Sequence, residues 1–237
     1  MSVDRIRVGL AIPHRYGQCH IALVRTLDRL DFSGMEVRLM DHARSSIVDN
    51  RNALVQAFLD MRPAGTHLFF IDTDVSVHRA ALKKLLSADR PIISGVYVDK
   101  KDLDFVVRRR QGDYDYRSVR PEWAKYPRGR SGPAWIIRED LRDRVLPCDA
   151  AGAGCLLIER KVLEKMPYPW FFHDFNPDAR EQKPGNSLSS DISFFKKAAG
   201  HGFSGYVHTG VLCYHWQGMR RFPPFWSEPE QQNSVEL

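Results

Sequence analysis

The stretch Thr66-His-Leu-Phe-Phe-Ile-Asp-Thr-Asp-Val-Ser-Val77 decides the fold. Residues 68–71 form a continuous apolar run of aromatic and β-branched character, which is typical of a buried central strand. The run ends in Asp72, Thr73 and Asp74. Two carboxylates at the mouth of a buried strand are costly unless a cation lies between them, and Mg²⁺ or Mn²⁺ prefers such oxygen ligands. The stretch therefore predicts a metal site, with the alternative that Asp74 or Ser76 caps a helix at 78–87.

Strands and helices alternate at short intervals on both sides of this stretch. The sequence predicts strands at 5–12 (ended by Pro13), 35–40 and 91–97, and helices at 19–30, 47–61 and 78–87. In the first helix, Ile21, Val24, Leu27 and Leu30 are expected to face the core. The alternation predicts an α/β fold with a Rossmann-like, mostly parallel central sheet flanked by helices.

A different composition marks residues 99–147, which hold 13 Lys or Arg against nine Asp or Glu, with aromatic residues between them. Such a segment either binds nucleic acid or stacks on a sugar, or is an irregular insertion packed by its own aromatic residues. Residues 135–137 are expected to form an edge strand. Beyond the insertion, we expect a strand at 155–158, a helix at 160–166, a helix capped by Ser189 and ended by Gly200 and Gly202, and a strand at 205–211.

Length and composition set the remaining bounds. The 237 residues predict a single domain over 1–219 and a tail over 220–237. The net charge of +6 favours an anionic ligand or partner. No apolar stretch approaches a membrane span of about 20 residues, and the N-terminus lacks the apolar core of a signal peptide. These features predict a cytoplasmic protein (host cytoplasm if it is viral) with four reduced, mostly buried cysteines. They leave the oligomeric state open.

Three further motifs accompany the acidic strand end in a fixed order. An arginine at a helix start, Arg51, follows the second strand, a small-residue turn at 152–154 opens a strand, and Ser190-Asp191-Ile192-Ser193-Phe194 opens a helix. Together they resemble the nucleotide-sugar glycosyltransferases of the GT-A fold, near the family 2 group. The segment 70–75 is similar to the Asp-any-Asp motif of that fold. Ser190 stands where a glutamate is common in the corresponding Glu-Asp-x-x-Phe segment, which leaves the choice of catalytic base open.

The resemblance implies a role for each motif residue. A divalent metal, Mn²⁺ or Mg²⁺, would be held by Asp72, Asp74 and His215, with a ribose contact as the other role for Asp72. The donor nucleotide would be held at Pro13, Asp49, Arg51, Asp72 and Thr73, and the donor sugar would lie beside Gly152 and Gly154. Asp191 would be the catalytic base, which implies inversion. From the residues alone, Arg51 could be an ordinary partly exposed arginine, His215 a structural histidine and Asp191 a helix-capping carboxylate.

The resemblance therefore predicts a metal-dependent transferase. It would move a sugar from a nucleotide-diphosphate donor, most often a uridine one in this fold, to a hydroxyl acceptor. Because the segment 99–147 lies where acceptor-binding elements of this fold often lie, the acceptor would be a hydroxylated base in DNA or a saccharide. Two other classes remain open: a non-catalytic nucleotide or nucleic-acid binding module, and a metal-dependent nuclease or phosphotransferase.

Overall fold

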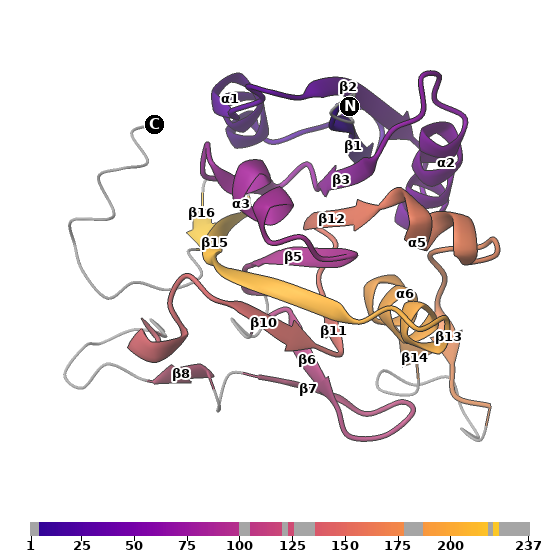
Figure 1. Ribbon diagram of the computed structural model, residues 1–237. Helices are drawn as coiled ribbons and strands as arrows, with labels where there is room; N and C mark the ends of the chain where they lie inside the picture. Colours follow the sequence, from indigo (N-terminus) through magenta and orange to yellow (C-terminus); the bar gives the residue numbers. More distant parts are fainter. Residues whose placement is uncertain are drawn as a thin grey trace.

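A mixed β-sheet forms the centre of the computed structural model, which describes residues 5–99, 105–119, 123–125, 136–177, 187–217 and 220–222 (Figure 1). Its strands lie in the order β10 (Val145–Cys148), β15 (Gly205–Gln217), β5 (Ile92–Val96), β12 (Cys155–Glu159), β3 (His67–Ile71), β1 (Arg7–His14) and β2 (Glu36–Ala43). Strands β2, β1, β3, β5 and β15 run in one direction, while β12 and β10 run against their neighbours. The mostly parallel sheet predicted from the sequence is confirmed.

Helices cover both faces of this sheet. One face packs on α1 (Ile21–Arg29) and α3 (Ala81–Ser87), and the other on α2 (Ile47–Leu59), α5 (Arg160–Lys165) and α6 (Ser190–Gly200) (Figure 1). Successive side chains of β3 enter opposite layers, so Phe69 joins the α1 side and Phe70 the α2 side. A strand buried on both faces must be apolar throughout, which is why β3 reads as a continuous apolar run.

The docking face of α1 differs from the prediction. Ile21 and Val24 are 60% and 49% exposed, whereas Ala22, Leu23 and Thr26 are buried. Apolar residues lie on two sides of this helix, so periodicity alone does not select the face, and packing against the sheet does.

Strand β1 also runs past its predicted end at Pro13. Its pairing with β3 stops at Ala11, while its pairing with β2 continues to His14. Pro13 therefore stands where β1 is paired on one side only, and the missing N–H of proline is tolerated there.

The segment 99–147 contains more regular structure than predicted. Strands β6 (Val107–Arg110) and β7 (Tyr116–Ser118) form a three-stranded sheet with β11 (Ala150–Ala151), and β8 (Ala124–Lys125) pairs with β9 (Ile136–Ile137). The predicted edge strand at 135–137 thus belongs to a separate two-stranded sheet, and its Trp135 lies outside the described residues. The segment ends in a 3₁₀ turn (Glu139–Leu141) and in β10, which pairs with β15 at the edge of the central sheet.

A small extension completes the molecule beside the carboxyl end of β3. Strands β4 (Val75–Val77) and β16 (Arg220–Phe222) pair antiparallel with the last part of β15. Strands β13 (Asp174–Phe175) and β14 (Ser187–Leu188) pair with each other. Because α3 begins after Ala80 without a side-chain cap, the alternative that Asp74 or Ser76 caps it is wrong. None of the helices in the described ranges has the length and apolar character needed to cross a membrane.

Candidate active site

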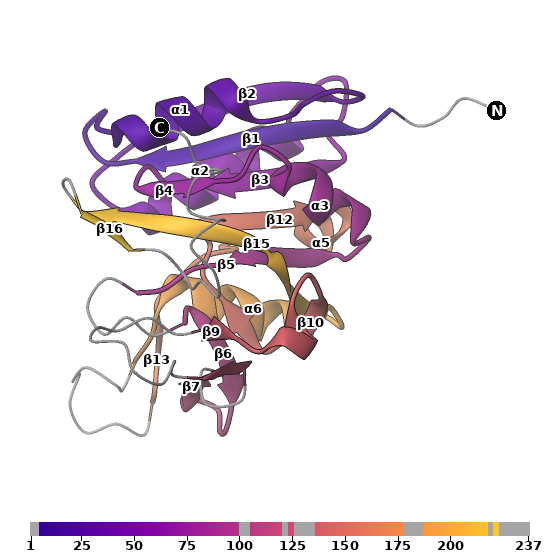
Figure 2. The same ribbon diagram turned by 90° about the vertical axis from the view of Figure 1, so that its left-hand side faces the viewer.

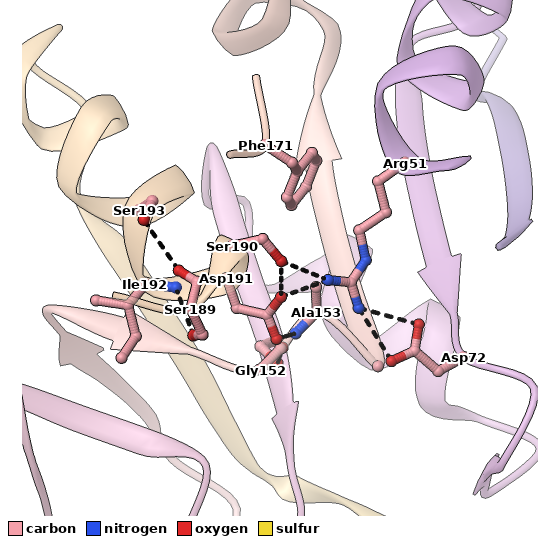
Figure 3. A network of polar contacts seen from close by, with 12 residues as sticks. Arg51, Asp72, Gly152, Ala153, Phe171, Ser189, Ser190, Asp191, Ile192 and Ser193 are labelled. Carbon is pink, nitrogen blue, oxygen red and sulfur yellow. Dashed lines mark hydrogen bonds and ion pairs between the residues drawn. The ribbon is translucent and has the colours of Figure 1, made fainter. Parts of the chain in front are cut away.

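Polar side chains from α2, the end of β3 and the start of α6 meet at the carboxyl edge of the sheet (Figure 3). Arg51 lies in the second turn of α2 and is 3% exposed. Asp72 follows β3 directly, and Asp191 lies in the first turn of α6. The fold therefore brings together three residues that the sequence singled out in three separate motifs.

Arg51 is the centre of this group. Its Nη2 donates to both carboxylate oxygens of Asp72 at 3.2 and 3.1 Å, and its Nη1 donates to Asp191 Oδ1 and, at 3.3 Å, to Ser190 Oγ. The guanidinium carbon of Arg51 lies 5.6 Å from the centroid of the Phe171 ring (Figure 3). Arg51 Nε is buried without a hydrogen-bond partner among the described residues. This geometry places Arg51 between two carboxylates, and its contact with the donor nucleotide stays a prediction.

The charges in this group control one another. Burial raises the pKa of Asp72, the charges of Asp191 and Asp74 raise it further, and Arg51 opposes them. Burial also disfavours the charged form of Arg51, but Asp191 and Asp72 outweigh it, so the pKa of Arg51 is raised. The group is held together because one guanidinium compensates two carboxylates at once.

Asp191 is oriented by donors on three sides. Besides Arg51, its Oδ1 accepts from Ser190 Oγ at 3.2 Å, and its Oδ2 accepts from the backbone N–H of Ala153 at 3.1 Å (Figure 3). The N-cap of α6 is Ser189, as predicted, so Asp191 is not the capping residue. Its side chain points across the sheet edge toward Asp72, where a carboxylate can accept further hydrogen bonds.

The turn at 152–154 encloses the hydroxyl group of Tyr97. Gly154 N–H donates to Tyr97 Oη at 2.9 Å, and a Cβ built on Gly152 would lie 1.9 Å from the same oxygen. The glycines make room for this tyrosine, and the approach of a donor sugar to their backbone stays a prediction. Burial, followed by the charges of Asp191 and Asp72, raises the pKa of Tyr97 well above its ordinary value, so this hydroxyl stays protonated.

Asp74 and His215 form a second pair beside this group. The Oδ1 of Asp74 lies 3.6 Å from Nε2 of His215, and Nδ1 of His215 lies 2.9 Å from the carbonyl oxygen of Val98. A carbonyl only accepts hydrogen bonds, so Nδ1 carries the proton, and a neutral His215 turns the lone pair of Nε2 toward Asp74. Two acceptors that face each other in this way leave a position between them for a proton or a cation.

The donor set of this pair fits a divalent metal, because a carboxylate and an imidazole with its other nitrogen bound to a carbonyl are common ligands. The third predicted ligand, Asp72, is engaged by Arg51. In the described ranges, no group of three or more His, Cys, Asp or Glu side chains is arranged so that it could hold a metal ion. The metal assignment therefore stays a prediction for Asp72, Asp74 and His215.

The other predicted residues surround these two groups. Pro13 is buried in β1 opposite His42, and the carbonyl of Thr73 accepts from the backbone N–H of His20 at 2.9 Å. Asp49 is exposed at the start of α2, where its N–H donates to Ser46 Oγ. None of the three contacts the Arg51 group through an interaction that the described residues show.

Tyr97 and the amide of Ala153 are two of the contributors that were not predicted as site residues. Tyr97 follows β5 directly, so its place at the carboxyl end of a strand was a signal available in the sequence. The amide of Ala153 left no such signal, because any residue supplies a backbone N–H.

Comparison with known proteins finds similarity in structure but not in sequence. No protein-family model matches the chain, and no curated protein matches it. The crystal structure of A197 from STIV is 18% identical, with a TM-score of 0.59, over 94% of this chain and 96% of that one. The structure of GalNAc-T7 with UDP, GalNAc and Mn²⁺ is 12% identical, with a TM-score of 0.53, over 94% of this chain and 46% of that one. At these identities the likeness establishes the architecture, and the chain therefore has the GT-A fold that its sequence motifs predicted.

Proposed function

We propose that this protein is a metal-dependent glycosyltransferase that moves a sugar from a nucleotide-diphosphate donor to a hydroxyl acceptor. The GT-A fold supports the reaction class, and the site at the carboxyl edge of the sheet supplies residues for each step. Asp74 facing the lone pair of His215 at 3.6 Å is the observation that carries the proposal.

Departure of the sugar leaves a diphosphate with growing negative charge. Asp74 and His215, with Asp72 as the predicted third ligand, would hold Mn²⁺ or Mg²⁺, which supplies a Lewis acid for that charge. Thr73 lies between the two acidic residues and would contact the donor through its backbone. Pro13, Asp49 and Arg51 would hold the nucleotide base.

Asp191 would accept the proton of the attacking hydroxyl. Arg51, Ser190 and the Ala153 amide orient its carboxylate, whose roughly four lone-pair sites are not all used by these three donors. A carboxylate with a lone pair left can act as a general base. A base on one side of the sugar and a leaving diphosphate on the other give an inverting displacement. Gly152 and Gly154 would line the sugar position next to the Tyr97 hydroxyl.

The donor and acceptor are proposed by analogy and charge. UDP is the nucleotide in the GalNAc-T7 structure, and a UDP-sugar is the proposed donor here. The basic segment 99–147 would contact the acceptor, either a hydroxylated base in DNA or a saccharide.

The proposal is tested by thermal unfolding with UDP-sugars, with and without Mn²⁺. A bound donor should raise the melting temperature only when Mn²⁺ is present, because ligand binding to the folded state stabilises it. Asp74→Asn should abolish this shift, and Asp28→Asn, which changes an exposed carboxylate on α1, should keep it. An unchanged Mn²⁺-dependent shift in Asp74→Asn would remove the metal assignment.

The base is tested separately with Asp191→Asn. This variant should still bind donor with Mn²⁺ but should not transfer sugar to an acceptor. If Asp191→Asn instead weakens donor binding and has no separate effect on transfer, Asp191 is not the base. Transfer to duplex DNA carrying a hydroxymethylated base should weaken steeply with salt, whereas transfer to an oligosaccharide should not.

A further inference from the structure

A second cavity lies between α1, β4 and the end of β15, elements that Figure 2 shows side by side. Its volume is about 210 Å³. Its walls are formed by Ala22, Arg25, Thr26, Arg29, Ser76, Val77, His78, Arg79, Tyr214 and Trp216. No residue of the candidate active site lies among them.

The cavity and the candidate active site lie on opposite faces of the β4–β15 pair. Side chains alternate along a strand, so Tyr214 and Trp216 point to one face of β15 and His215 to the other. Ser76 pairs with Tyr214 and shares its face. His215 faces Asp74, while Ser76, Tyr214 and Trp216 face the cavity. The two sites are therefore separate but share one layer of backbone.

Positive charge dominates the rim of the cavity. Arg25 and Arg29 come from α1, and His78 and Arg79 from the turn after β4. No carboxylate is among the described residues that line it. The pKa of His78 is lowered, first by burial and then by Lys84 and Arg79, as expected where positive charges gather. The three arginines belong to one set of lining residues, and guanidinium groups suit phosphate oxygens, which accept two N–H donors at once.

The floor of the cavity includes the buried hydroxyl group of Ser76. Trp216 Nε1 donates to Ser76 Oγ at 2.8 Å, and the Trp216 ring stacks on His20 with centroids 4.8 Å apart. Ser76 is 8% exposed, and because its oxygen already accepts from Trp216, its hydroxyl proton is available to an acceptor. An apolar wall with a few convergent polar groups is the usual character of a small-molecule site.

We propose that this cavity is a second binding site, which takes the phosphate group of a small phosphate monoester. Arg25 and Arg79 bind the phosphate oxygens, Ser76 donates to one of them, and the remainder of the ligand lies against Tyr214 and Trp216. The volume is below the roughly 300–1,000 Å³ of drug-sized pockets, which favours a sugar phosphate or a mononucleotide over a larger ligand.

The test is isothermal titration calorimetry in EDTA, which keeps divalent metal from the candidate active site. Glucose 1-phosphate, uridine monophosphate and inorganic phosphate are titrated into the wild type and into the double variant Arg25→Gln/Arg79→Gln. Both arginines are exposed, so the variant should fold. Loss of two charge-assisted contacts should weaken monoester binding by about tenfold or more.

Arg38→Gln is the matched control, because Arg38 is exposed on β2 and does not line the cavity. Affinity should be unchanged in this control. A monoester that weakens in the double variant identifies the source of the phosphate. The proposal is overturned if neither monoester binds to the wild type, if the double variant binds both monoesters as tightly as the wild type, or if Arg38→Gln loses as much affinity as the double variant. Because the measurement needs neither metal nor transfer, its failure is distinct from failure of the proposed function.

Discussion

Replacing Arg51 by glutamine tests how the candidate active site is held together. The change removes the guanidinium that compensates Asp72 and Asp191 but keeps most of the side chain that packs on Phe171. Two carboxylates would then face each other without their shared cation, and Ser190 would lose a hydrogen-bond donor.

The expected loss is about 3 kcal/mol in the free energy of unfolding. Removing one partner of a buried ion pair costs about 3–5 kcal/mol, and the lower end applies because the side chains of Asp72 and Asp191 are each 23% exposed. For a chain of this length, such a loss corresponds to about 6–12 °C in melting temperature. Arg38→Gln removes an exposed charge of the same kind and should change stability by no more than about 0.5 kcal/mol.

The loss should depend on pH, with a defined sign. Without Arg51, burial and the charges of Asp191 and Asp74 raise the pKa of Asp72 above its ordinary 3.8 with no opposing cation. A carboxyl group with a raised folded pKa destabilises the fold when it ionises, so the loss is largest at neutral pH. It should shrink as the pH falls through the raised pKa toward 3.8.

Urea denaturation of the wild type and both variants, at several pH values between 7 and 4, measures these differences. The double variant Arg51→Gln/Asp72→Asn should recover at least about 1 kcal/mol relative to Arg51→Gln, because one uncompensated charge is gone. The reasoning is refuted if Arg51→Gln costs no more than Arg38→Gln, or if its cost grows as the pH falls.

Three further results are expected. Gly152→Ala should lower the free energy of unfolding by about 1–3 kcal/mol, because the new Cβ would lie 1.9 Å from Tyr97 Oη. Gly200→Ala is the control, because a Cβ at Gly200 meets open space and should not destabilise the fold. Similar thermal unfolding of the two variants would contradict the packing around Tyr97. Asn52→Ala should cost about 2–4 kcal/mol in urea denaturation, because its buried amide bonds three backbone groups of the loop after α5; a loss below 1 kcal/mol would argue against that role. In the native protein, Ellman's reagent should react readily with Cys19 alone, because the other three thiols are buried and burial raises the pKa of two of them; four fast thiols would contradict this.

The sequence by itself determined the layers of the fold and the residues that end its central strand. Local apolar patterns carry this information, because a strand buried on both faces must be apolar throughout and an amphipathic helix must repeat every 3.6 residues. The acidic residues after β3 and the start of α6 at Ser190 follow from the same local rules.

Tertiary structure alone decided which residues meet. Arg51 contacts Asp72 and Asp191, which lie 21 and 140 residues away in the sequence. The local sequence around Arg51 does not specify either partner, because a guanidinium near a helix start can pair with any nearby carboxylate. The docking face of α1 and the pairing of β10 with β15 were also settled by packing, because the local patterns there fit more than one arrangement. Local periodicity determines which face of a segment can be buried. Only the assembled sheet determines which neighbour that face packs against.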